Sequence, residues 1–274
     1  MSIINELTDL AVEMGRESVD QAMIDDYRSN GFVKIPNLIT RDCAQSFRAE
    51  ALNFIHKNES DDESVEKWKS SSSRLNQHML VWRESDVIEK MTKSKDIAAI
   101  AEQLSGLKLR LWHDHLLSKG PGNALATEWH QDGPYWPFQG KTECISIWIA
   151  LQDTPEEHGC MSFIPGSHRL IDLPTTDVRE PDSFWKVAPE LEYAPKVQLP
   201  LKAGDATFHH GFTAHMGMPN ILEDWRVAHV ITYMKDGTKM GDIKHHVTET
   251  YKAEMGELPP GQVLNQSWFP RLTE

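Results

Sequence analysis

Hydrophobic and polar positions alternate in two stretches after residue 106. Leu107, Leu109 and Leu111 alternate with Lys108, Arg110 and Trp112, and residues 143–151 continue with the same period. A period of two is typical of β-strands. In the second stretch Ile145, Ile147, Ile149 and Leu151 form one face, and Cys144, Ser146, Trp148 and Ala150 form the other. The aliphatic face suits packing against helices. The mixed face either leaves room for a ligand or buries Trp148 in a core.

The first 105 residues follow a helical period instead. Phe47, Ala51, Phe54 and Ile55 recur at helical spacing behind Thr40, a residue type that caps helices, and residues 97–104 repeat the pattern before Gly106. Short strands are expected at residues 32–36, 160–164, 206–210 and 226–234. Residues 58–76 predict a mobile loop. Residues 171–200, with five prolines, predict a long excursion between strands, where substrate lids are common.

Many short strands separated by turn signals predict a mainly β fold with flanking α-helices. The architecture that fits best is a double-stranded β-helix, a jelly-roll barrel of the cupin type. We expect helical N-terminal support over roughly residues 1–105 and the barrel over roughly residues 106–240. Because nothing in the 274 residues reads as a linker, we expect one domain over residues 1–274.

Composition narrows the cellular setting and the partners. With 28 Lys and Arg against 41 Asp and Glu, the net charge of −13 would repel a phosphate backbone, so nucleic acid is not expected as a partner. No uncharged apolar run approaches the roughly 20 residues of a membrane span, so no membrane partner is expected. The three cysteines, the odd set Cys43, Cys144 and Cys160, and the early acids Glu6 and Asp9 favour a cytoplasmic protein.

The segment Trp129-His130-Gln131-Asp132 carries the candidate chemistry. In a strand or at a strand end, residues i and i+2 point to the same side, so His130 and Asp132 can reach one ion. With His215 from a neighbouring strand they would make the 2-His-1-carboxylate face that holds non-haem Fe(II). A His-x-Asp pair is a weak signal in a chain with 13 histidines, and its context must support it.

Two features supply that context. Arg226 opens a predicted strand eleven residues after His215, and an Arg inside a barrel needs an anionic partner such as a dicarboxylate cosubstrate. Tyr135, Trp136 and Phe138 follow the predicted metal pair, which makes them candidate substrate-binding walls, although such a cluster is as often plain core.

These residues resemble the phytanoyl-CoA dioxygenase family of Fe(II)- and 2-oxoglutarate-dependent oxygenases over about residues 27–234. The motifs on which the resemblance rests are Asp26-Tyr27-Arg28-Ser29-Asn30-Gly31-Phe32, His130-Gln131-Asp132, Ile147-Trp148-Ile149-Ala150-Leu151, Gly159-Cys160, Pro165-Gly166-Ser167-His168, Gly204-Asp205, His215 and Arg226. The resemblance implies that His130, Asp132 and His215 bind iron. It also implies that Arg226 holds the distal carboxylate of 2-oxoglutarate, with Trp148 against that cosubstrate, and that O2 is the second cosubstrate.

The chain departs from the family pattern in two places. His158 precedes the Gly-Cys pair where the family usually has Asn, and the stretch after His168 has no likeness that carries over acyl-CoA binding. The substrate therefore stays open beyond a small organic molecule. Because Asp132 supplies the carboxylate that related halogenases lack, hydroxylation is favoured, with desaturation or cyclisation as alternatives.

Two other classes of protein could use the same ligands. A cupin-like binding or sensing protein would keep the triad without needing Arg226, and an isomerase or hydrolase could place zinc or manganese there, since affinity alone does not select iron. Dependence on 2-oxoglutarate separates both from an oxygenase.

The remaining histidines have plainer interpretations. His210 is expected to be a buried hydrogen-bonding residue near the metal. His113 and His115 share a face, where packing or substrate contact is favoured over a second metal. His168 and the pair His245-His246 are expected to be structural or exposed.

Overall fold

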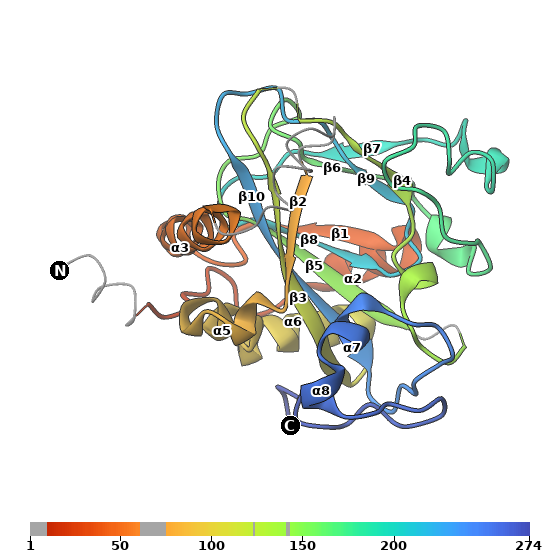
Figure 1. The fold of residues 1–274 in the computed structure, drawn as a ribbon. Coiled ribbons are helices and arrows are strands. Elements are labelled where there is room, and N and C mark those ends of the chain that lie inside the picture. Colours follow the sequence, from red (N-terminus) through yellow and green to blue (C-terminus); the bar gives the residue numbers. More distant parts are fainter. Residues whose placement is uncertain (1–9, 61–74, 123, 141–142) are drawn as a thin grey trace.

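Two antiparallel sheets face each other in the computed structural model, which describes residues 10–60, 75–122, 124–140 and 143–274. The six-stranded sheet has the order β1 (Phe32–Ile35), β8 (Ala206–His210), β5 (Cys144–Ala150), β10 (Arg226–Lys235), β3 (Leu109–Lys119) and β2 (Leu75–Met79). The four-stranded sheet has the order β4 (Thr127–His130), β9 (His215–Gly217), β6 (Met161–Phe163) and β7 (Val197–Leu199). This arrangement confirms the predicted jelly-roll barrel (Figure 1).

The helices lie on the side of the six-stranded sheet that faces away from the smaller sheet (Figure 1). They are α2 (Gln21–Asn30), α3 (Arg41–Ser60), α5 (Asp86–Thr92) and α6 (Lys95–Ser105). Two further short helices, α7 (His246–Thr250) and α8 (Lys252–Met255), follow β10. The predicted cap of α3 is confirmed, because Cys43 N donates to Thr40 Oγ1 at 3.3 Å. Helix α6 ends at Gly106, whose φ of +71° favours glycine.

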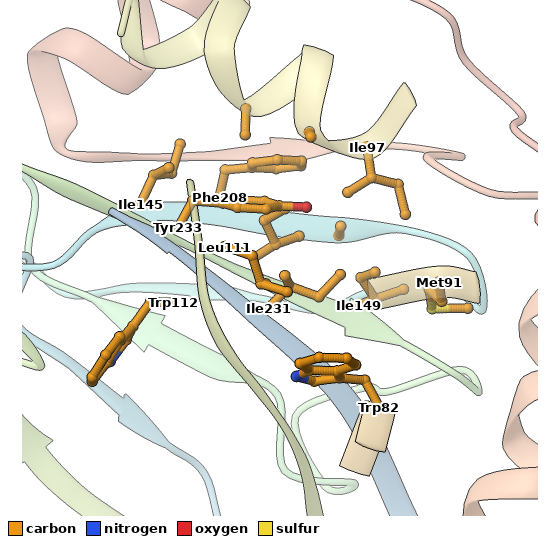
Figure 2. Close-up of a cluster of buried hydrophobic side chains, with 14 of the residues drawn as sticks. Trp82, Met91, Ile97, Leu111, Trp112, Ile145, Ile149, Phe208, Ile231 and Tyr233 are labelled. Atoms are coloured by element: carbon orange, nitrogen blue, oxygen red, sulfur yellow. The ribbon is translucent and has the colours of Figure 1, made fainter. Parts of the chain in front are cut away.

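The outer face of the six-stranded sheet forms the main hydrophobic core against these helices. Figure 2 shows Ile145, Ile149, Phe208, Ile231 and Tyr233 from the sheet close to Ile97 and Met91 from the helices. The aliphatic face predicted for residues 143–151 is therefore the core face. Its opposite face turns Trp148 toward the inside of the barrel, where this side chain lines a cavity.

A β-bulge in β3 changes which residues face the barrel interior. Tyr233 pairs with Leu111 and Thr232 with His113, so Trp112 is the extra residue between them. Strict alternation would place His113 and His115 on the same face as Leu111. Because of the bulge, both histidines instead line the interior cavity, while Leu111 stays in the core.

The two predicted irregular segments differ from their expectations. Residues 61–74 of the expected loop at 58–76 lie outside the described residues, but its ends are regular, since α3 runs to Ser60 and β2 begins at Leu75. The excursion at 171–200 is largely irregular, and its end forms β7, which pairs with β6. Phe184 and Ala188 of this excursion pack with Trp129 in a separate apolar cluster.

Three strands of the smaller sheet are too short for the hydrophobic period of the sequence to predict them. Strands β4, β7 and β9 have only three or four residues each.

Within the described residues, no helix combines the length and the apolar character needed to cross a membrane.

Candidate metal centre and cavity

The structure brings the three predicted metal ligands together at the meeting point of β4 and β9. His130 ends β4, His215 begins β9, and the two are register partners. Asp132 lies just beyond the strand end, at the start of a short 3-10 turn. Among the described residues, His130, Asp132 and His215 are the group of His, Cys, Asp or Glu side chains whose ligand atoms all lie within 4.8 Å of one another.

Hydrogen bonds to the backbone orient both imidazoles. His130 Nδ1 lies 2.7 Å from Glu128 O, and His215 Nδ1 lies 2.9 Å from Thr213 O. Since a carbonyl only accepts, each Nδ1 carries the proton and each Nε2 presents a lone pair. The two Nε2 atoms lie 3.6 and 3.7 Å from Asp132 Oδ1. Three lone-pair donors therefore converge on one point.

Burial sets the charge state of this cluster. It lowers the pKa of His215 to about 3, with the neighbouring His130 as the next cause, so the ring is neutral and ready to bind a metal. Burial would raise the pKa of Asp132, but His215, His130 and His209 outweigh it and hold that pKa well below its usual range. An anionic carboxylate beside the neutral imidazole of His215 suits the binding of a divalent cation.

The cluster opens into a cavity of about 390 Å³ between the two sheets. Of the three aromatic residues predicted as substrate walls, Tyr135 and Trp136 line this cavity. The prediction is wrong for Phe138, which packs in the main core with its ring 5.0 Å from that of Trp112. Phe138 forms an isolated antiparallel β-bridge with Met240, which also belongs to the main core.

Arg226 and Trp148 lie side by side at the other end of the cavity. The guanidinium carbon is 5.5 Å from the centre of the indole ring, and one guanidinium nitrogen, Nη1, donates to Leu117 O at 3.0 Å. Lys119 is the register partner of Arg226 and is fully buried, with Nζ donating to Gly217 O and Met218 O. Burial, and then the charge of Arg226, lowers the pKa of Lys119.

This end of the cavity has the chemistry of an anion site. Arg226 Nε and Trp148 Nε1 are buried donors with no hydrogen-bond partner among the described residues. Leaving such donors unpaired is costly, as is burying the Arg226 cation without an anion. A dicarboxylate that reaches from the metal ligands to Arg226 would supply what is missing, so the residues fit both iron and 2-oxoglutarate.

Sequence reasoning chose the wrong member of the pair His209-His210. His209 is the one that faces the cavity, with Nε2 3.5 Å from Asp132 Oδ2. His210 lies on the opposite face of β8, where its Nδ1 accepts from Phe212 N and its ring lies near His168. The alternation of β8 could have made this distinction, because Phe208 belongs to the core and His209 must then face inward.

Other cavity residues come from segments that gave no signal. His245 was expected to be structural or exposed. It is structural, since it is buried and caps α7, and it also lines the cavity, which was not predicted. Gln77 of β2 also lines the cavity and bonds to His115 Nδ1 at 2.8 Å. The departure at His158 is a loop contact, because its ring bonds to the carbonyls of Asp153 and Asp224.

Comparison with known sequences gives one family and consistent relatives. A family model described as phytanoyl-CoA dioxygenase (PhyH) matches residues 27–228. The peroxisomal phytanoyl-CoA dioxygenase of Rattus norvegicus is 23% identical over 247 residues, which cover 85% of this chain and 73% of the rat protein. A probable alpha-ketoglutarate-dependent hypophosphite dioxygenase of Stutzerimonas stutzeri is 28% identical over 49% of this chain and 48% of that protein.

Solved structures agree with the sequence matches. The non-heme alpha ketoglutarate dependent carbocyclase SnoK from nogalamycin biosynthesis superposes with a TM-score of 0.76 at 27% identity, covering 92% of this chain and 96% of SnoK. The epimerase SnoN, solved with Fe3+, alpha ketoglutarate and nogalamycin RO, gives a TM-score of 0.75 at 26% identity, covering 92% of this chain and 98% of SnoN.

Proposed function

Since the chain belongs to the phytanoyl-CoA dioxygenase family and is a non-haem iron dioxygenase that uses 2-oxoglutarate and O2, we propose that it hydroxylates an unactivated C–H bond of a small organic molecule. Succinate and CO2 would be the co-products. The observation that carries the proposal is the convergence of His130 Nε2, Asp132 Oδ1 and His215 Nε2 on one point of a cavity that ends at a buried Arg226.

Each residue has one task in this proposal. His130, Asp132 and His215 hold Fe(II), and the backbone carbonyls at their Nδ1 atoms keep the two imidazoles in the ligand orientation. Arg226 binds the distal carboxylate of 2-oxoglutarate, and Trp148 packs against the cosubstrate. Bound iron with 2-oxoglutarate and O2 supplies the oxidising chemistry, while the protein orients the substrate and excludes water.

The cavity favours a small substrate without a coenzyme A group inside the barrel. Its volume of about 390 Å³ must hold both 2-oxoglutarate and the substrate, and ligand pockets usually span about 300–1,000 Å³. Beyond the proposed ligands of iron and cosubstrate, the charged side chain in the described lining is Lys244, which is 85% exposed. Tyr135 and Trp136 would pack against the carbon skeleton of the substrate.

Ring closure or epimerisation is the second candidate outcome, because SnoK and SnoN are a carbocyclase and an epimerase. Either reaction would use the same metal ligands and cosubstrate. Desaturation differs from hydroxylation only in the fate of the substrate carbon. The mass of the product separates these outcomes: hydroxylation adds an oxygen atom, desaturation and cyclisation remove two hydrogen atoms, and epimerisation leaves the mass unchanged.

The first experiment is an anaerobic titration of metal-free protein with Fe(II) and then 2-oxoglutarate, followed by visible absorption. A charge-transfer band from the iron chelate of the 2-oxo acid is expected. Arg226→Leu should weaken 2-oxoglutarate binding by about 2 to 5 kcal/mol, since it removes a buried charge-assisted pair. Arg169→Leu is the matched control, because Arg169 donates to Ser29 O outside the cavity.

Unchanged cosubstrate affinity in Arg226→Leu would refute the role of Arg226. Metal binding without any band would favour the non-catalytic cupin class. When the band forms, candidate substrates can be screened by succinate release.

The remaining sequence-based expectations stay predictions. A single domain over residues 1–274 is supported by the main core, which joins Phe47 and Ile97 of the helices to Ile147 and Phe208 of the barrel. The cytoplasmic location rests on the sequence alone.

A further inference from the structure

A row of polar side chains crosses the inner face of the six-stranded sheet beneath Asp132. His209 of β8 pairs in register with Ser146 of β5, and Ser146 pairs with Thr232 of β10. All three are at most 2% exposed. Because polar groups at such positions need hydrogen-bond partners, a row of them in a barrel interior points to a polar group on the facing side.

That group is the second oxygen of the Asp132 carboxylate. Ser146 Oγ donates to Asp132 Oδ2 at 3.4 Å, and His209 Nε2 lies 3.5 Å from the same atom. Thr232 Oγ1 lies 3.4 Å from Ser146 Oγ and can donate to it, which leaves the Ser146 proton for the carboxylate. The two oxygens are thus divided: Oδ1 faces the Nε2 atoms of His130 and His215, and Oδ2 faces the polar row.

His209 is buried and packed between two other rings in this position. Its ring centre lies 5.6 Å from that of Phe163 and 4.7 Å from that of His215. Of its two ring nitrogens, Nε2 faces the carboxylate, whereas Nδ1 is buried without a partner among the described residues. A neutral imidazole has one N–H, and the nearby anion favours it on Nε2.

We propose that His209 and Ser146 are positioning residues that hold Asp132 through Oδ2, so that Oδ1 alone is presented to the metal. The inference rests on the proposed function, since it assumes that Asp132 is an iron ligand. A carboxylate that bound through both oxygens would occupy a position that the cosubstrates need. Partners of this kind typically contribute 10- to 100-fold to metal affinity.

The test is the affinity of metal-free protein for Co(II), read from the visible d–d absorption, which needs neither substrate nor turnover. His209→Phe keeps the ring contacts with Phe163 and His215 but removes the donor, and we expect roughly 10- to 100-fold weaker binding with an altered d–d spectrum. His209→Gln keeps an N–H donor and should restore most of the affinity. Ser146→Ala should weaken binding several-fold.

His210→Gln is the matched control, because His210 is the next residue of β8 and faces away from the cavity. It should bind Co(II) like the wild type. The inference is overturned if His209→Phe binds within about twofold of the wild type, or if His209→Gln is as weak as His209→Phe.

The proposed function has its own control. Failure of the wild type to bind Co(II), or tight binding by Asp132→Asn, would instead refute the metal-ligand assignment. Should His209→Phe not fold, Ser146→Ala decides, and wild-type affinity there overturns the inference.

Discussion

The protein contains two clusters of aspartate and histidine, one on each face of the six-stranded sheet, with opposite properties. Asp132 lies at the inner face with a side chain 26% exposed to the cavity. Asp114 and His229 lie at the outer face, fully buried in the core, with His229 Nε2 3.2 Å from Asp114 Oδ2. The residue types are the same, but only the first cluster has the arrangement of ligand atoms from which we propose a metal site.

The partners of each carboxylate explain the difference. Asp114 Oδ2 accepts from Trp82 N at 3.1 Å and from Thr92 Oγ1 at 2.9 Å, besides facing His229. These donors belong to the protein and connect the 3-10 turn at Trp82 and the last residue of α5 to β3. At Asp132 the two oxygens differ. The imidazoles of His130 and His215 donate their Nδ1–H groups to backbone carbonyls, so their Nε2 lone pairs face Oδ1, and donors meet only Oδ2. A carboxylate oxygen that meets only donors is structural, whereas one that faces lone pairs is suited to bind a metal.

We expect the largest effect from a substitution that disrupts only the inner cluster. Asp132→Gly should abolish hydroxylation and metal binding, because two histidines hold Fe(II) poorly without the carboxylate. The variant should still unfold cooperatively, since Asp132 lies at the cavity wall. Succinate release and urea unfolding measure the two effects, and full retained turnover would contradict the ligand assignment.

The converse variant breaks the outer cluster. Asp114→Ala should lower the free energy of unfolding by about 3 to 5 kcal/mol, because it leaves the Trp82 N–H, the Thr92 hydroxyl and His229 buried without their acceptor. Where the variant remains folded, its Co(II) affinity should match the wild type. Urea unfolding is the measurement, and a loss below about 1 kcal/mol would show that Asp114 is not the structural anchor.

Lowering the pH should destabilise the folded metal-free protein through the inner cluster. Since burial lowers the pKa of His215 to about 3, the unfolded chain, with a histidine pKa of about 6.5, binds a proton that the folded chain excludes. Stability should therefore fall as the pH decreases through the window between these two pKa values, by about 1.4 kcal/mol per pH unit. Unfolding from pH 6.5 to 4 measures the slope, and His215→Gln should reduce it; an identical slope would contradict the buried neutral state.

We expect the smallest effect from a substitution that removes a single hydrogen-bond donor from the outer cluster. Thr92→Val keeps the shape of the side chain but loses the hydroxyl that donates to Asp114, so stability should drop by about 1 to 2 kcal/mol. Turnover and 2-oxoglutarate affinity should not change. A change in either would mean that the two clusters are coupled through β3 and β10.

Strands with an apolar pattern were predictable, among them the short β1 and β6, whereas the polar β2 and the short β4, β7 and β9 were not. The alternation over residues 143–151 placed Ile147 in the core and Trp148 in the cavity, because a sheet buried on both sides imposes its period on a long strand. Strand β2 has the polar sequence Asn76-Gln77-His78 and was not predicted as a strand, and its first two residues fell within the expected loop at 58–76. It is a strand because β3 pairs with it, which no local pattern records.

By itself the sequence determined the barrel class and the family, because strand periodicity and the order of motifs can be read locally. It also singled out His130, Asp132, His215 and Arg226, which line one cavity and stay the proposed ligands of iron and cosubstrate. Tertiary structure alone decided which of the other histidines line the cavity. The bulge at Trp112 turns His113 and His115 inward, β8 presents His209 rather than His210, and the chain after β10 returns His245 to the cavity. These outcomes depend on register and on contacts between distant segments, and a one-residue shift reverses the face of every side chain that follows.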